Sequence, residues 1–136
     1  MIELRLIAKD QCGDDELAAV IGMFDVVAEA LGLDDRECAA ILGVPVGALP
    51  LRPGRPELSV SQETCLRRVI DVGTALGLLI GDPDLVAEWM RTPCAWLGAA
   101  TPVTVMTTEA DGVSRVRRKL TAWCGSRFGP VSWSSR

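Results

Sequence analysis

The stretch that decides the fold is residues 81–125, which read GDPDLVAEWMRTPCAWLGAATPVTVMTTEADGVSRVRRKLTAWCG. Two dipeptides in it, Asp82-Pro83 and Thr101-Pro102, place a helix-capping side chain before a proline at the first helical position. Asp111-Gly112 breaks the second of these helices and leads into another one. The stretch therefore predicts three helices, over residues 83–92, over one or two turns from residue 102, and over residues 113–123.

Two tryptophans of this stretch, Trp89 and Trp96, lie seven residues apart. Leu85 precedes Trp89 by one helical turn, which predicts that Trp89 belongs to the core. Trp96 follows Pro93 and is expected in a loop, where it is a candidate for partial exposure. Large aromatic side chains that are few and clustered in one half of a chain more often anchor a core or an interface than fill space.

The last helix of the stretch combines an apolar face with a basic one. Val116, Leu120 and Trp123 are expected to face inward, and Cys124-Gly125 is expected to end the helix. The outward face carries the basic residues Arg115, Arg118 and Lys119.

Charge is divided unevenly along the chain. All 18 acidic residues lie at or before Asp111, against eight basic ones, a balance of −10; after Asp111 there are six basic residues and no acidic one, so the net charge is −4. A cationic C-terminal end fits DNA phosphates, an acidic protein partner or a pocket that normally takes an anionic ligand. It is also consistent with a solvated basic face and a loose tail.

The N-terminal half is also helical in pattern. Apolar residues from Leu17 to Leu31 recur at three- and four-residue steps, which predicts an amphipathic helix that Asp14 or Asp15 caps and Gly32 ends. Before it, the alternating residues of the run 2–6 predict one short strand or an extended arm.

A second helix is expected from Asp34 or Asp35 to Leu42, followed by a glycine turn and a short helix within residues 44–50. This is the outline of a helix-turn-helix. The reading helix is chemically poor, however, because residues 46–49 are Val, Gly, Ala and Leu and offer no side-chain donors to bases. Only Arg52 and Arg55 remain as weak DNA-binding candidates, suited to phosphates.

The Pro/Gly-rich loop at residues 51–56 is the natural boundary between the two halves. Beyond it, Ser59 and Gln62 have the spacing of a capping box that opens a long helix to about Ile80. Gly73 and Gly77, four residues apart, leave a smooth patch where another backbone can approach closely.

The composition excludes several classes of function. The chain contains no His and five scattered Cys without a C-x-x-C pair, so we expect no catalytic site, no metal site, no cofactor and no enzymatic activity. The cysteines are expected to be small buried thiols. Neither a signal peptide nor a long uncharged apolar run is present, which predicts a cytoplasmic protein without membrane association.

Residues 81–120 resemble the C-terminal toxin-binding domain of the Xre/MbcA/ParS antitoxin family, and the resemblance extends over about residues 58–125. Its landmarks are Gly81-Asp82, Ala87-x-Trp89-Met90, Thr92-Pro93, Leu97-Gly98, Thr101-Pro102, Gly112 and the Val116–Leu120 pair. It implies an antitoxin that neutralises a RES-domain toxin, an NAD-targeting enzyme, by a complex that blocks the toxin's active site. It further implies a homodimer within a larger heteromeric complex, and in some members binding to operator DNA as a transcriptional repressor, which is the alternative function.

The expectation is thus an all-α protein with three parts: a degenerate helix-turn-helix half at residues 1–57, a compact helical toxin-binding domain at 58–125, and a basic tail at 126–136. The tail is short and carries two aromatic residues. The candidate toxin-binding residues are Trp96, Arg115, Arg118, Lys119, Trp123, Arg127, Phe128, Trp133 and Arg136.

Overall fold

The structure is a computed structural model that describes residues 2–52 and 57–128, with side chains described for residues 16–52 and 57–125. Within these ranges it is all-helical and contains no strand, which confirms the expected fold class. The helices are α1 (Ile2–Ala30), α2 (Asp35–Leu42), η1 (Val46–Ala48), α3 (Val60–Leu79), α4 (Pro83–Met90), η2 (Ala95–Leu97), α5 (Pro102–Thr108) and α6 (Gly112–Phe128).

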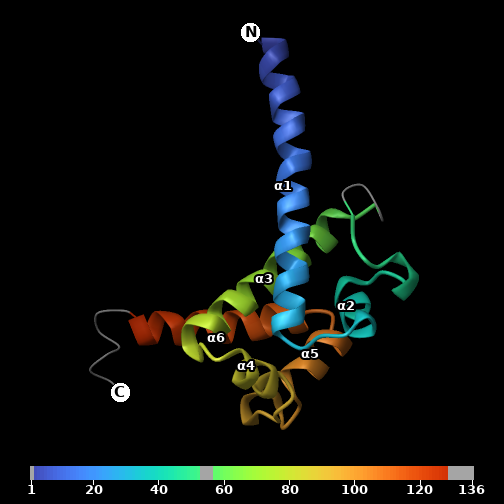
Figure 1. Ribbon diagram of the computed structural model, residues 1–136. Helices are drawn as coiled ribbons and strands as arrows, with labels where there is room; N and C mark the ends of the chain where they lie inside the picture. The colour runs from blue at the N-terminus through green and yellow to red at the C-terminus, as the bar shows by residue number, and fades with distance from the viewer. Residues whose placement is uncertain (1, 53–56, 129–136) are drawn as a thin grey trace.

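Helix α1 is longer than the sequence pattern predicted, and its N-terminal half extends away from the rest of the molecule (Figure 1). It begins at Ile2, so the predicted strand or arm at residues 2–6 is wrong. The helix continues through Asp14 and Asp15, so neither residue caps its start. The physical reason is that a helix satisfies its own backbone hydrogen bonds, whereas a lone strand has no partner strand.

The end of α1 and the start of α2 follow the sequence signals. Gly32 has a positive φ of 73° directly after α1, as expected for a helix-ending glycine. Asp34 and Glu37 form a capping box at the start of α2, and Gly43 ends α2 in the left-handed conformation. The two predicted boundaries of this short helix are therefore confirmed.

Helix α3 begins at the predicted capping box: the Ser59 side chain accepts from the Gln62 backbone N–H, and the Gln62 side chain accepts from that of Ser59. Of the two glycines on α3, only Gly73 is approached closely by another helix. A Cβ built there would lie 2.5 Å from Cγ1 of Val27 on α1, whereas a Cβ at Gly77 would meet nothing within 4 Å. The close approach is thus between α1 and α3, at one glycine of the predicted pair.

The three predicted helix starts of the C-terminal stretch are also present. Asp82 caps α4 by accepting from the Asp84 backbone N–H, and Thr101 caps α5 by accepting from that of Thr104. Helix α6 starts at Gly112, where a Cβ would lie 1.9 Å from the carbonyl oxygen of Val105. Only a glycine fits this crossing of α5 and α6 without backbone movement.

The predicted end of the last helix is wrong. Helix α6 continues past Cys124 and Gly125 to Phe128, so the first part of the expected tail is helical. A glycine inside a helix lowers helix stability without ending it when the next residues still gain backbone hydrogen bonds.

One hydrophobic core joins all six α-helices. Its largest fully buried side chains come from both halves of the chain, among them Phe24 and Leu31 of the α1 region, Leu66 and Leu76 of α3, and Leu120 of α6. Helix α3 packs most extensively, against α6 on one side and α1 on the other. The division into 1–57, 58–125 and 126–136 stays a prediction.

The cysteines with described side chains are free thiols. Cys38 is buried, as expected, while Cys65, Cys94 and Cys124 are half-buried. Burial, together with nearby acidic residues such as Asp35, raises the pKa of the Cys38 thiol to about 11, so this side chain is neutral at physiological pH.

Candidate protein-binding site

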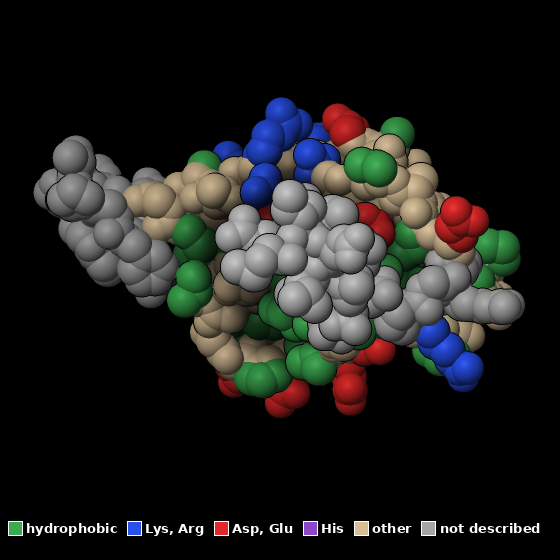
Figure 2. All heavy atoms as spheres, turned by 90° about the horizontal axis from the view of Figure 1, so that it is seen from above, with side chains coloured by type: hydrophobic (Ala, Val, Ile, Leu, Met, Phe, Trp, Pro, Cys, Tyr) green, Lys and Arg blue, Asp and Glu red, His purple; other side chains and the backbone are tan. Residues whose placement is uncertain are grey.

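Most of the Lys and Arg side chains visible in Figure 2 gather on one side of the face that it shows, and one lies apart from them. Asp and Glu are scattered around the same face. On α6, Arg117 forms an ion pair with Asp71 of α3 at 2.8 Å, and Arg115 forms one with Glu109. Arg118 and Lys119 make no ion pair with any described residue, so their charges remain available to a partner.

Three tryptophans, from α4, η2 and α6, meet beside these basic residues. Trp89 of α4 and Trp96 of η2 stack with ring centroids 6.5 Å apart, and Trp96 meets Trp123 of α6 edge to face at 5.6 Å. All three side chains are half-buried. The partial exposure predicted for Trp96 is therefore confirmed, while Trp89 packs at the edge of the core and not fully inside it.

The ammonium group of Lys119 lies over two of these rings, 5.9 Å from the Trp96 centroid and 5.5 Å from the Trp123 centroid. A cation at this distance is attracted by the electron-rich face of an indole. This contact holds the Lys119 side chain against the tryptophans while its charge stays at the surface. The i, i+4 spacing of Lys119 and Trp123 indicates their contact from sequence, but nothing in the sequence places Trp96 beside them.

A surface hollow of about 390 Å³ lies at this point and is lined by Trp96, Arg115, Arg118, Lys119 and Ala122. We call it the cationic hollow. Its basic side chains come from consecutive turns of α6, and its aromatic wall comes from η2. The hollow fits an acidic or otherwise anionic group with an apolar neighbour, because it offers both charge and an indole face.

The structure brings together five of the predicted site residues: Trp96, Arg115, Arg118, Lys119 and Trp123. Phe128 is the last residue of α6. The side chains of Arg127, Phe128, Trp133 and Arg136 lie outside the described residues, so their part in the site stays a prediction. Sequence analysis missed Arg117, whose ion pair joins α6 to α3 across 46 residues of chain.

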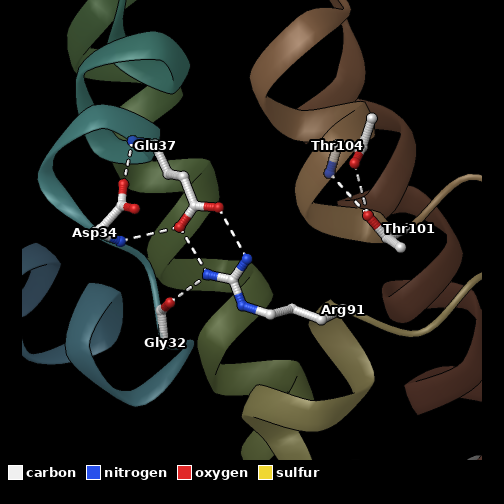
Figure 3. A network of polar contacts seen from close by, with 6 residues as sticks. All are labelled: Gly32, Asp34, Glu37, Arg91, Thr101 and Thr104. Atoms are coloured by element: carbon white, nitrogen blue, oxygen red, sulfur yellow. Dashed lines mark hydrogen bonds and ion pairs between the residues drawn. The ribbon is translucent and has the colours of Figure 1, made fainter.

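A second polar element ties the C-terminal part of the chain to the N-terminal half (Figure 3). Arg91, directly after α4, donates two hydrogen bonds to the Glu37 carboxylate, at 2.7 and 3.0 Å, and one to the carbonyl oxygen of Gly32 at 2.6 Å. Glu37 also accepts from the Asp34 backbone N–H. The hydrogen bond from Arg91 lowers the pKa of Glu37, which keeps the carboxylate charged.

The structure gives little support to a DNA-reading element. The second helix of the expected helix-turn-helix is a single 3-10 turn, Val46–Ala48, and none of its side chains carries a polar group. Arg52 is exposed after it, and Arg55 lies outside the described residues. DNA binding therefore stays a prediction.

Among the described residues, no helix has the combination of length and apolarity that crossing a bilayer requires.

The described part of the chain is a small helical domain with a surface that combines basic side chains and tryptophans. Residues 75–125 match the family model of the antitoxin Xre/MbcA/ParS C-terminal toxin-binding domain. None of the curated proteins matches the chain. The resemblance noted from the sequence is thereby confirmed, over a segment that begins inside α3.

The family match points to an antitoxin with a toxin-binding function and implies a cognate toxin as partner. The matched family is generally non-enzymatic. The cationic hollow lies entirely within residues 75–125, because Trp96 and the basic residues of α6 all fall inside the match.

Proposed function

We propose that this protein is the antitoxin of a type II toxin-antitoxin system that neutralises a RES-type, NAD-targeting toxin by forming a complex that blocks the toxin's active site. The observation that supports this most is the cationic hollow inside the family-matched segment. There Arg118 and Lys119 are not neutralised by described acidic residues, and Trp96 provides an adjacent apolar wall.

We expect the basic C-terminal tail, residues 126–136, to contribute to the same contact with the toxin. Helix α6 carries the basic residues of the hollow and leads directly into residues 129–136. Arg127 and Arg136 add charge for acidic groups of the toxin, and Phe128 and Trp133 add aromatic anchors. An enzyme that binds a dinucleotide has an open entrance to its active site, and a tail of this kind can occupy that entrance or compete for substrate contacts.

Charge reversal in the hollow tests the proposal. The double variant Arg118→Glu/Lys119→Glu is expected to raise the Kd for a purified, catalytically inactive RES toxin at least about tenfold, because like charges then face the toxin's acidic groups. Arg36→Glu is the control: it reverses one charge on an exposed residue of α2 outside the family match. Equal affinity of the double variant and the control would contradict this role of the hollow.

Deletion of residues 127–136 tests the tail. We expect the shortened protein to lose inhibition of NAD consumption by the active toxin and to lose rescue of growth on co-expression. Unchanged inhibition would reject the role of the tail. The mass of the purified complex in solution checks the expected homodimer within a larger heteromeric assembly.

A further inference from the structure

A second depression lies beside the cationic hollow and is lined only by apolar residues. It has a volume of about 330 Å³ and lies between the end of α3, α4 and α6, with the lining residues Leu76, Leu79, Ile80, Trp89, Leu120 and Trp123. Leu76 and Leu120 are buried and form its floor, while the other four are half-buried and form its rim. We call this depression the apolar groove.

The apolar groove lies wholly inside the toxin-binding segment, because each of its lining residues falls within residues 75–125. A hollow of about 420 Å³ between α2, α3 and α5 differs in this respect, since Gly43 and Gln62 line it from outside the match. Leu85, which does not line the groove, is 50% exposed and precedes Trp89 by one turn of α4, so it adds exposed apolar surface on the same face of that helix. A contiguous apolar surface of this kind is typical of a protein contact.

The groove and the cationic hollow lie side by side, because their lining tryptophans are in contact. Trp123 lines the groove and also contacts Trp96, which lines the hollow. Lys119 lies over both rings and therefore places a positive charge at the boundary between the two depressions. A partner that fills both must carry an apolar side chain next to a negative charge.

We propose that the apolar groove receives one large aliphatic or aromatic side chain of the toxin, and that a neighbouring carboxylate of the toxin contacts Lys119. This inference rests on the proposed function and names the chemistry of the segment that the antitoxin recognises. The groove supplies the buried anchor of the contact, and Lys119 orients the partner and excludes segments without an acidic residue.

Charge complementarity favours the toxin over two other occupants. The chain's own tail carries Arg127 and Arg136 and no acidic residue, so its docking would bring further cations toward Lys119. A second copy of this chain, packed symmetrically through the same face, would place Arg118 and Lys119 near their own counterparts. A segment of a different protein that carries an acidic and an apolar side chain avoids both of these repulsions between like charges.

Two neighbouring leucines provide a matched test. Leu79 lines the groove, whereas Leu78 on the same helix is 59% exposed and does not line it. Leu79→Glu is expected to raise the Kd for a catalytically inactive RES toxin roughly 30-fold or more, and Leu78→Glu to change it less than about threefold. If Leu79→Glu lowers the melting temperature, Leu79→Ala replaces it, with an expected rise in Kd of roughly fivefold or more.

The contribution of the toxin's carboxylate is measured by how the affinity for the toxin changes with salt concentration. Lys119→Glu is expected to weaken binding and to flatten or reverse the fall of affinity with added salt, because an attractive charge pair becomes a repulsive one. Wild-type salt dependence in this variant would contradict the pairing with Lys119.

The outcomes separate the inference from the function on which it rests. Tight binding of the toxin by a folded Leu79→Glu variant would overturn the groove as anchor, while leaving the antitoxin function standing. Unchanged toxin affinity with loss of self-association in the same variant would also overturn it, because the groove would then hold a second copy. Absence of binding by the wild-type protein would overturn the proposed function itself and the inference with it.

Discussion

Helices α1 and α4 show two different ways in which this chain builds a helix. Helix α4 has eight residues, begins at the capping side chain of Asp82 and a proline, and stops before Pro93. Helix α1 has 29 residues and passes through Asp14 and Asp15, two residues that commonly cap helix starts. Its C-terminal half is held by packing against α3, where Gly73 lets Val27 approach.

The difference shows which helix boundaries depend on local chemistry. A short helix is only marginally stable on its own. A capping side chain that accepts a hydrogen bond from one free backbone N–H group therefore helps to decide at which residue the helix starts. In a long helix, each added residue gains a backbone hydrogen bond, and a capping residue in the middle has no free N–H group to satisfy. Substitutions in α1 and in the helices of residues 82–128 test whether local caps or packing between helices stabilise each region.

The largest effect is expected at the crossing of α5 and α6. Gly112→Ala places a methyl group against the Val105 carbonyl, 1.9 Å away, and this backbone atom cannot move aside as a flexible side chain would. We expect a loss of roughly 3 kcal/mol of unfolding free energy, measured by chemical denaturation. Gly77→Ala is the control: it meets nothing within 4 Å and should stabilise α3 by about 0.5–1 kcal/mol. Equal effects of the two changes would show that the α5–α6 crossing is not tight.

The next effect concerns the contact that joins the two regions. Arg91→Ala removes the hydrogen bonds to Glu37 and to Gly32, and because the Arg91 side chain is 48% exposed we expect a cost of only about 1 kcal/mol at neutral pH. Since Arg91 lowers the pKa of Glu37 below the ordinary 4.5, this stability is present above pH 4.5 and is lost as the pH falls through the folded-state pKa.

The measurement is the difference in unfolding free energy between wild type and Arg91→Ala at several pH values. The difference should be constant from neutral pH down to about 5 and shrink at lower pH. A difference that does not change with pH would mean that the Glu37 charge contributes nothing to the contact. Glu37→Gln should show the same acid dependence relative to wild type.

The smallest expected effect on stability concerns the residues that cap helix starts. Asp82→Ala removes the bond to the Asp84 backbone N–H at 2.9 Å and should cost about 1 kcal/mol. Asp15→Ala, in the middle of α1, should change stability by less than about 0.5 kcal/mol. Thermal unfolding of both variants checks this pair. A larger loss for Asp15→Ala would indicate that α1 starts in solution near residue 15, as the apolar pattern alone predicted.

Part of the proposed binding surface could also be predicted from the sequence. The i, i+4 pair Lys119 and Trp123 and the outward position of Arg118 follow from helical periodicity alone. The meeting of Trp89, Trp96 and Trp123 does not, because it depends on how η2 and α4 are placed against α6. The same placement forms the apolar groove.

The sequence by itself determined the all-helical class, the caps at Asp34, Ser59, Asp82 and Thr101, and the match of residues 75–125 to the antitoxin family model. These are local properties, because a cap acts within one turn and an apolar stripe repeats every three to four residues. The sequence patterns did not give the length of α1 or the extension of α6 beyond Gly125, which follow from backbone hydrogen bonds that continue along each helix. Only the tertiary structure decided the ion pairs of Arg91 and Arg117 and the convergence of the tryptophans. Each of these joins, or depends on, segments far apart in the chain, whose contact free energy appears only when the helices pack.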